Sequence, residues 1–270
     1  MDLYGVMGNP IEHSRSPKIH ALFAEQTRQD ITYEKIFVPI NGFKEAVEQF
    51  KQRGGKGLNV TLPFKQDAFD LADSTSEFAK QAGAVNTLTI NPSGEIVGEN
   101  TDGIGLVRDL LVNQKIKIQD KAILLIGAGG AARGVIGPLL KQQPTLLHVT
   151  NRTEEKAHEL KFLFHQFGSI SSSGLSDIPN IKFDIVINAT SASLNQNIPA
   201  ISPTLISPHC FFYDMVYGNE LTLFLQWVKG LGAQHYVDGK GMLLEQAAES
   251  FFIWRGVRPN TALIKDKVFE

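Results

Sequence analysis

A glycine-rich segment in the middle of the chain constrains the fold more than any other feature of the sequence. Gly127-Ala128-Gly129-Gly130-Ala131-Ala132 follows the apolar run 121–126 and precedes a helical pattern. Such a run is typical of a strand that is buried on both faces of a parallel sheet. The spacing G-x-G-x-x-A then places a tight turn between strand and helix, because glycine tolerates the backbone that this turn needs. The segment therefore predicts a β-turn-α unit of an α/β domain.

The same turn is suited to a dinucleotide. Its second glycine lets a pyrophosphate approach the backbone, and the helix N-terminus faces the phosphates. The next strand ends at Thr150-Asn151-Arg152-Thr153. This end carries no acid for a ribose 2′-hydroxyl, whereas the Arg152 guanidinium suits a 2′-phosphate. We therefore predict a Rossmann-type NADP domain; the alternatives are a tight turn without a ligand and a solvated Arg152.

Apolar runs alternate with helical patterns along the chain, as in an α/β protein with two domains. At 270 residues, 43% of them hydrophobic, the chain is long enough for two cores. Strands are expected over 3–7, 33–40 and 57–62, with helices from Ser16, over 43–50 and over 66–72, so we expect a mainly parallel first sheet. The C-terminal helix, about 241–254, is expected to pack on this domain. We place one domain at residues 1–102 plus 238–270 and the Rossmann-type domain at 103–237.

Charge and cysteine content exclude several classes of protein. Lys and Arg number 26 and Asp and Glu 28, so the net charge is −2, and nucleic-acid binding through phosphate contacts is disfavoured. The single cysteine, Cys210, rules out a disulfide framework, and the seven histidines show no metal spacing. No signal peptide and no apolar stretch of about 18 residues is found. We expect a cytoplasmic protein with neither a nucleic-acid nor a membrane partner.

Four polar segments follow or end the apolar runs of the first domain. Ligands of open α/β sheets bind beyond the carboxyl ends of the strands, so we expect these segments to gather around one ligand. Their hydroxyls, amides, one lysine and one aspartate suit a small polyhydroxylated and carboxylated molecule rather than an apolar one. The segments are 8–17, 59–65, 83–87 and 100–103.

Taken together, these segments and the glycine turn resemble the shikimate dehydrogenase family. The match runs from Gly8-Asn9-Pro10 to the segment from Gly239 to Ala247 and covers nearly the whole chain. The resemblance implies NADPH-dependent reduction of 3-dehydroshikimate to shikimate, in the pathway to chorismate and the aromatic amino acids. It also implies an α/β substrate domain and a Rossmann-type NADP domain, with the active site in the cleft between them.

The resemblance further implies roles for individual residues. Lys65 would be the catalytic acid/base, paired with Asp102, and Ser14 and Ser16 would hold the substrate carboxylate. The other substrate-binding residues would be Asn59, Thr61, Asn86, Asp102, Tyr217 and Gln246. NADP would be bound by Gly127, Ala128, Gly129, Gly130, Ala131, Asn151, Arg152, Thr153, Glu154, Glu155 and Lys156, with Met215 and Gly239 near the nicotinamide. No metal is implied.

The chemistry of ketone reduction supports the roles of Lys65 and Asp102 independently. Hydride delivery leaves an alkoxide, which a nearby ammonium group can stabilise and protonate. An aspartate beside the lysine would orient it and accept a hydrogen bond from a substrate hydroxyl. The alternatives are a surface lysine at Lys65, a helix N-cap at Asp102 and plain structural roles for Tyr217 and Gln246.

Ser193 stands where relatives usually carry glycine, so the resemblance does not give the conformation of the local loop. Lys240 adds a positive charge near the expected cleft.

Two other functions stay open. They are a quinate/shikimate dehydrogenase with broader cofactor use and a non-catalytic sensor of NADP and a hydroxy acid. Arg152 argues weakly against the first, and the pair Lys65 and Asp102 argues against the second. We expect a monomer or a homodimer.

Overall fold

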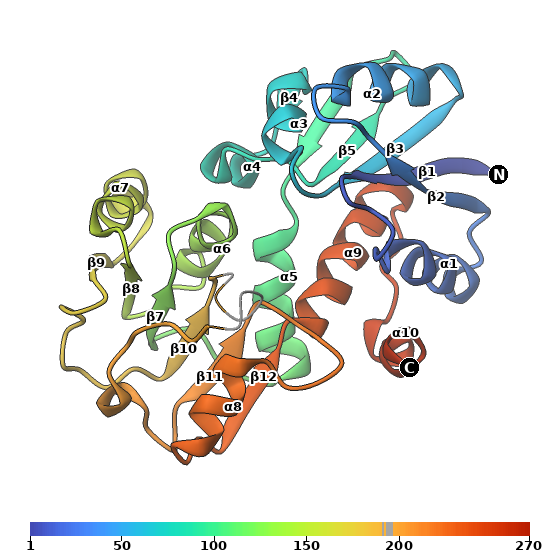
Figure 1. Cartoon of the computed structure of the whole chain (residues 1–270). Helices are drawn as coiled ribbons and strands as arrows, with labels where there is room; N and C mark the ends of the chain where they lie inside the picture. Colours follow the sequence, from blue (N-terminus) through green and yellow to red (C-terminus); the bar gives the residue numbers. More distant parts are fainter. Residues whose placement is uncertain (191, 193–196) are drawn as a thin grey trace. The chain divides into compact units, whose positions relative to one another are not determined.

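The computed structural model divides into two compact units. Unit 1 comprises Met1–Gly105 and Leu243–Glu270, and unit 2 comprises Leu106–Met242 (Figure 1). The structure describes residues 1–190, 192 and 197–270, so the expectation about Ser193 lies outside the described residues. The sequence analysis expects domain boundaries at 102/103 and 237/238, and these boundaries remain a prediction.

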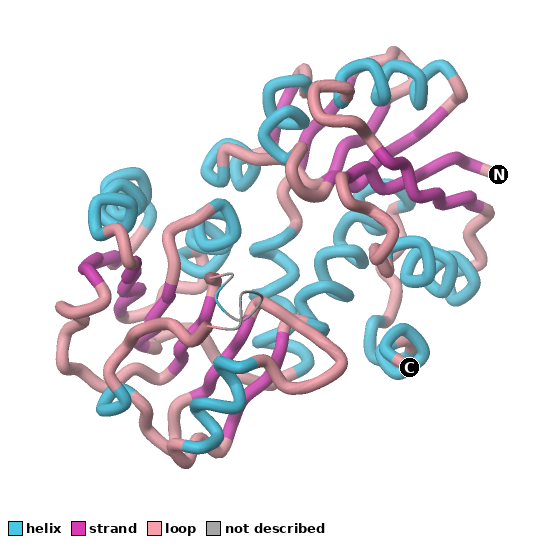
Figure 2. Tube along the Cα trace, viewed as in Figure 1, coloured by secondary structure: helices cyan, strands magenta, loops and turns pink. Residues whose placement is uncertain are grey.

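Unit 1 is built on a six-stranded mixed sheet with the strand order β2-β1-β3-β5-β6-β4. Figure 2 draws the strands in magenta and the helices in cyan. Strand β1 (Asp2–Gly8) runs parallel to both β2 (Ile31–Phe37) and β3 (Gly55–Val60). Strand β5 (Thr87–Ile90) runs antiparallel to β3 and to β6 (Ile96–Glu99), whereas the short β4 (Ser74–Thr75) is parallel to β6. Three of the five pairings are therefore parallel.

The sequence analysis anticipated neither the short β4 nor the β5–β6 hairpin. The turn of the hairpin holds Asn91, whose N–H donates to Glu95 O at 2.9 Å, and Gly94, which has a φ of +86°. Asn, Pro, Ser and Gly are turn-forming residues, so the signal was present in the sequence. The hairpin returns the chain to its start, where Asn86 N donates to Glu99 O at 3.0 Å. It thereby brings the segments 83–87 and 100–103 to one edge of the sheet.

Among the described residues, seven α-helices lie wholly or partly in unit 1. They are α1 (Ser16–Thr27), α2 (Phe43–Gln52), α3 (Lys65–Leu71), α4 (Glu77–Ala82), α5 (Asp102–Arg108), α9 (Lys240–Arg255) and α10 (Lys265–Phe269). Helix α9 shares a buried cluster with α1, in which Phe23 meets Ala247 and Phe251. No helix in the described part of the chain is long and apolar enough to cross a lipid bilayer.

Unit 2 is built on a six-stranded sheet in which every pairing is parallel, with the order β12-β11-β10-β7-β8-β9. Counted within the unit, this is the order of the dinucleotide-binding fold, in which ligands bind at the carboxyl ends where the strand order reverses. The reversal lies between β7 and β10. The strands are β7 (Ala122–Ile126), β8 (Leu146–Asn151), β9 (Ile170–Gly174), β10 (Ile185–Asn188), β11 (Phe211–Asp214) and β12 (His235–Asp238).

Strand β7 is buried on both of its faces, as its sequence predicts. Ile123 and Leu125 join one hydrophobic cluster with α6 (Gly130–Leu140) and α7 (Glu154–Phe164), while Leu124 and Ile126 join another with α8 (Leu223–Gly230). None of these four side chains is exposed to solvent. The glycine turn that follows is therefore anchored by a rigid strand.

Candidate active site and cofactor site

Lys65 and Asp102 form an ion pair in unit 1. Each is the first residue of a helix, Lys65 of α3 and Asp102 of α5, so both side chains start near the sheet edge where the polar loops end. Lys65 Nζ lies 2.5 Å from Asp102 Oδ2, and the two side chains are 28% and 19% exposed. A held but accessible ammonium group is what proton transfer to a bound substrate requires.

Asn86 holds the other oxygen of the Asp102 carboxylate. Its Nδ2 donates to Asp102 Oδ1 at 2.8 Å and to Thr101 Oγ1 at 3.0 Å, and its Oδ1 accepts from Thr101 N at 2.9 Å. Asn86 is buried. Both carboxylate oxygens of Asp102 are thus engaged by side chains, which fits an orienting role better than that of a plain helix cap.

Asn59 lies behind Asn86 and is itself buried. Its Nδ2 donates to Asn86 O at 3.3 Å, Thr87 Oγ1 at 3.2 Å and Ser250 Oγ at 3.0 Å, and its Oδ1 accepts from the Tyr33 hydroxyl at 2.8 Å. With its amide held in this way, Asn59 supports Asn86, and its own contact with substrate stays a prediction.

Helix α9 adds two polar side chains to this group. Gln246 and Ser250 are four residues apart on α9 and so share a face of the helix. Gln246 Oε1 accepts from Thr101 Oγ1 at 3.4 Å, and Ser250 Oγ lies 2.8 Å from Thr87 Oγ1. The sequence analysis did not single out Tyr33, Thr87, Thr101 or Ser250. Thr87 and Thr101 stand in the polar segments 83–87 and 100–103, and the signal for Ser250 was its spacing from Gln246.

Ser14 and Thr61 lie on the loops that follow β1 and β3, and Ser16 is the first residue of α1. All three are half-buried. Ser14 Oγ accepts from Ser16 N at 3.3 Å, and Thr61 N donates to Met7 O at 2.9 Å. Within the described residues, the hydroxyls of Ser14 and Thr61 do not join the hydrogen-bonded group around Asp102. Their assignment to substrate stays a prediction.

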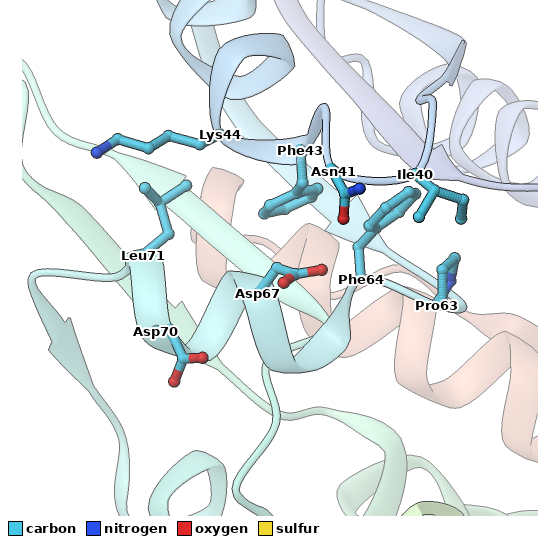
Figure 3. Close-up of a pocket in the computed structure, with 9 residues that line it drawn as sticks. All are labelled: Ile40, Asn41, Phe43, Lys44, Pro63, Phe64, Asp67, Asp70 and Leu71. Atoms are coloured by element: carbon cyan, nitrogen blue, oxygen red, sulfur yellow. The ribbon is translucent and has the colours of Figure 1, made fainter.

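A separate hollow of about 500 Å³ lies in unit 1 beside α3 (Figure 3). Its floor includes Phe43 and Phe64, whose stacked rings are 5.4 Å apart. Its charged groups are the carboxylates of Asp67 and Asp70 and the amine of Lys44. Two carboxylates against one amine disfavour a carboxylated ligand, so this hollow does not suit the predicted substrate.

Two glycines of the turn in unit 2, Gly127 and Gly129, have different structural roles. Gly127 has a φ of +115°, and a Cβ there would lie 3.1 Å from Thr190 Cγ2 and 3.2 Å from the Ala189 carbonyl carbon. A Cβ on Gly129, by contrast, would meet no atom within 4 Å. Gly127 is therefore needed by the fold, whereas Gly129 leaves space beside the start of α6 for a ligand.

A hollow of about 710 Å³ lies against this turn in unit 2. The exposed cationic side chains of Arg152 and Lys156 line it, which suits a 2′-phosphate. Glu154 and Glu155 are not among the described residues that line it, and Glu154 instead lies 3.2 Å from His158. Of the predicted cofactor residues, Gly127, Ala128, Gly129, Gly130, Ala131, Asn151, Arg152, Thr153 and Lys156 line the hollow.

Met215 and Gly239 meet at the ends of β11 and β12. A Cβ on Gly239 would lie 2.3 Å from Met215 O, so the two backbones touch only because residue 239 is glycine. Tyr217 follows on the same loop of unit 2 and is 37% exposed. Its contact with substrate stays a prediction.

No metal site emerges among the described residues, because no three His, Cys, Asp or Glu side chains gather there in a way that could hold an ion.

Comparison with known proteins gives consistent matches along the chain. Residues 6–88 match the model described as shikimate dehydrogenase substrate binding domain, 110–198 match shikimate / quinate 5-dehydrogenase, and 239–269 match shikimate 5'-dehydrogenase C-terminal domain. The shikimate dehydrogenase (NADP(+)) of Nitrosospira multiformis is 53% identical over 260 residues, 96% of this chain and 94% of that protein.

Two solved structures are similar over nearly their whole length. The Ael1 enzyme from Pseudomonas putida has a TM-score of 0.93 at 42% identity, covering 99% of this chain and 98% of the other. The shikimate 5-dehydrogenase of Thermus thermophilus, in complex with NADP(H) and shikimate, has a TM-score of 0.87 at 28% identity with the same coverage.

Proposed function

The chain belongs to the shikimate dehydrogenase family, and we propose that it catalyses the reversible, NADPH-dependent reduction of 3-dehydroshikimate to shikimate. The observation that carries the proposal is the group formed by Lys65, Asp102 and Asn86. It offers one ammonium donor and one oriented carboxylate beside loops rich in hydroxyls.

In the proposed reaction, NADPH supplies the hydride when it is bound, and the protein handles the proton. Lys65 Nζ stabilises the negative charge that develops on the carbonyl oxygen and donates a proton to it. Asp102 keeps the ammonium group in place and accepts a hydrogen bond from a ring hydroxyl. Ser14 and Ser16 would bind the substrate carboxylate, and Thr61 and Asn86 would bind ring hydroxyls. Tyr217 and Gln246 would also contact the substrate.

For the cofactor we propose that the hollow beside Gly127–Ala131 binds the pyrophosphate and that Arg152 and Lys156 bind the 2′-phosphate. Met215 and Gly239 would lie near the nicotinamide. The expected position of the active site between the two domains, a cytoplasmic location and a monomeric or homodimeric state stay predictions.

The test is a spectrophotometric assay of shikimate oxidation with NADP and with NAD side by side. We expect turnover with NADP and little with NAD. Quinate is assayed in parallel, because similar kcat/KM values for quinate and shikimate would favour a quinate/shikimate dehydrogenase. Tight NADP binding without turnover of either hydroxy acid would contradict the proposal and favour a non-catalytic sensor.

A further inference from the structure

Tyr33 lies behind the polar group around Asp102 and is not one of the predicted site residues. It stands on β2, an edge strand of the unit 1 sheet. Its hydroxyl donates to Asn59 Oδ1 at 2.8 Å and also interacts with the Ser16 side chain. Its ring stacks on the imidazole of His20, with centroids 4.2 Å apart and planes at 7°. His20 is fully buried. The stacked rings and the hydrogen bond together hold the phenol in one position.

The Asn59 amide has one orientation that satisfies its neighbours. One of the groups facing its Nδ2 is the carbonyl oxygen of Asn86, which can only accept a hydrogen bond. The amide nitrogen must therefore face Asn86, and the amide oxygen must face Tyr33. A hydroxyl at Tyr33 is the donor that this orientation requires.

Asn59 links Tyr33 to the reacting pair. Its amide donates to the backbone of Asn86, and the Asn86 side chain donates to Asp102 Oδ1 at 2.8 Å. Asp102 Oδ2 in turn holds Lys65 at 2.5 Å. A change at the phenol thus reaches Lys65 through a continuous series of hydrogen bonds within unit 1.

We propose that Tyr33 is a positioning residue for the reaction: its hydroxyl fixes the Asn59 amide, which holds Asn86 and thereby orients Asp102 against Lys65. The inference rests on the proposed function, because it takes Lys65 as the acid/base. Burial raises the pKa of the Tyr33 phenol well above its usual value near 10, so the group remains a donor at every working pH.

The experiment compares Tyr33→Phe with Tyr4→Phe in the full chain. Tyr4 is buried, lies opposite Tyr33 in the β1–β2 pairing and loses a hydrogen bond from Arg255 in the same substitution. Tyr33→Phe keeps the ring stacked on His20 and removes only the hydroxyl. Thermal unfolding first verifies that both variants are folded.

We expect Tyr33→Phe to lower kcat/KM for shikimate roughly threefold to tenfold, the effect of one lost neutral hydrogen bond. The KM for NADP should stay at the wild-type value, because the cofactor residues are in unit 2. Tyr4→Phe should leave both constants unchanged. Ser250→Ala, which releases the same Asn59 amide from its other side, should reproduce the selective loss and carries the test should Tyr33→Phe not fold.

A double-mutant cycle with Asn59→Ala separates positioning from a general structural role. If Tyr33 acts through Asn59, adding Tyr33→Phe to Asn59→Ala costs no further activity. Unchanged shikimate kinetics in Tyr33→Phe, an equal effect of Tyr4→Phe, or additive losses in the cycle would each overturn the inference. A wild-type protein that fails to oxidise shikimate would instead overturn the proposed function.

Discussion

Lys65 Nζ and Asp102 Oδ2 lie 2.5 Å apart, although 37 positions separate the two residues in the chain. The pairing arises because α3 and α5 begin at the same edge of the unit 1 sheet, where the β5–β6 hairpin returns the chain. An ammonium group at such a pair is both oriented and partly exposed, and these are the properties on which the first prediction depends.

Lys65→Ala should lower kcat by roughly 10²–10⁴-fold, the usual contribution of a general acid or base. The KM for shikimate should change little, since the loops that carry the hydroxyls are untouched. Steady-state kinetics of shikimate oxidation measure both. Lys44→Ala serves as the control, because Lys44 lies at the hollow that does not suit the substrate. A rise in the KM for shikimate with kcat preserved would contradict a catalytic role of Lys65.

Arg152→Ala should raise the KM for NADP by roughly tenfold to a hundredfold, since a hydrogen bond to a charged group contributes about 1.5–3 kcal/mol. The KM for NAD, which lacks the 2′-phosphate, should stay nearly constant. Lys161→Ala removes one positive charge from α7, the helix that follows Arg152, without touching the hollow, and should have no effect. An equal rise in KM for NADP and for NAD would mean that Arg152 does not bind the 2′-phosphate.

Gly127→Ala and Gly129→Ala should fail in different ways. At Gly127 a side chain is strained by the φ of +115° and crowds Ala189, so unit 2 should lose about 1–3 kcal/mol of stability. At Gly129 the added methyl enters open space, so the thermal unfolding midpoint should hold while NADP affinity falls. Calorimetry and cofactor titration of both variants check this. The assignment fails if Gly129→Ala binds NADP as the wild type does.

The local parts of this architecture were predictable from the sequence. Strand β7, the glycine turn and the helices after Ser16 and Lys65 rest on short-range patterns, and the family motifs indicated Lys65 and Asp102. Tyr33 was not predictable, because its partner Asn59 lies 26 positions away, and the spacing of Ser250 from Gln246 gave no sign of its contact with Asn59, 191 positions away. Buried polar side chains become visible only when the fold brings their hydrogen-bond partners together.

His20 should make the protein lose stability as the pH falls. Its imidazole is fully buried, and neither ring nitrogen makes a hydrogen bond of standard geometry among the described residues, although the Asn59 side chain lies near enough to offset part of the effect of burial. Burial lowers its pKa to about 3, from the usual 6.5. Between these values the unfolded chain binds the proton and the folded chain does not. Stability from this group is therefore complete above pH 6.5 and declines steadily below it, by about 2 kcal/mol between pH 6.5 and 5.

The measurement is urea denaturation of the wild type and of His20→Phe at pH 7 and pH 5. Phenylalanine can keep the stacking on Tyr33 but cannot titrate, so the variant should lose less stability over this interval than the wild type. His13→Phe makes the same change in an exposed loop and is the control, which should keep the wild-type pH dependence. Equal slopes for His20→Phe and the wild type would show that another group, such as the buried His148, whose pKa burial lowers to about 4, sets the acid sensitivity.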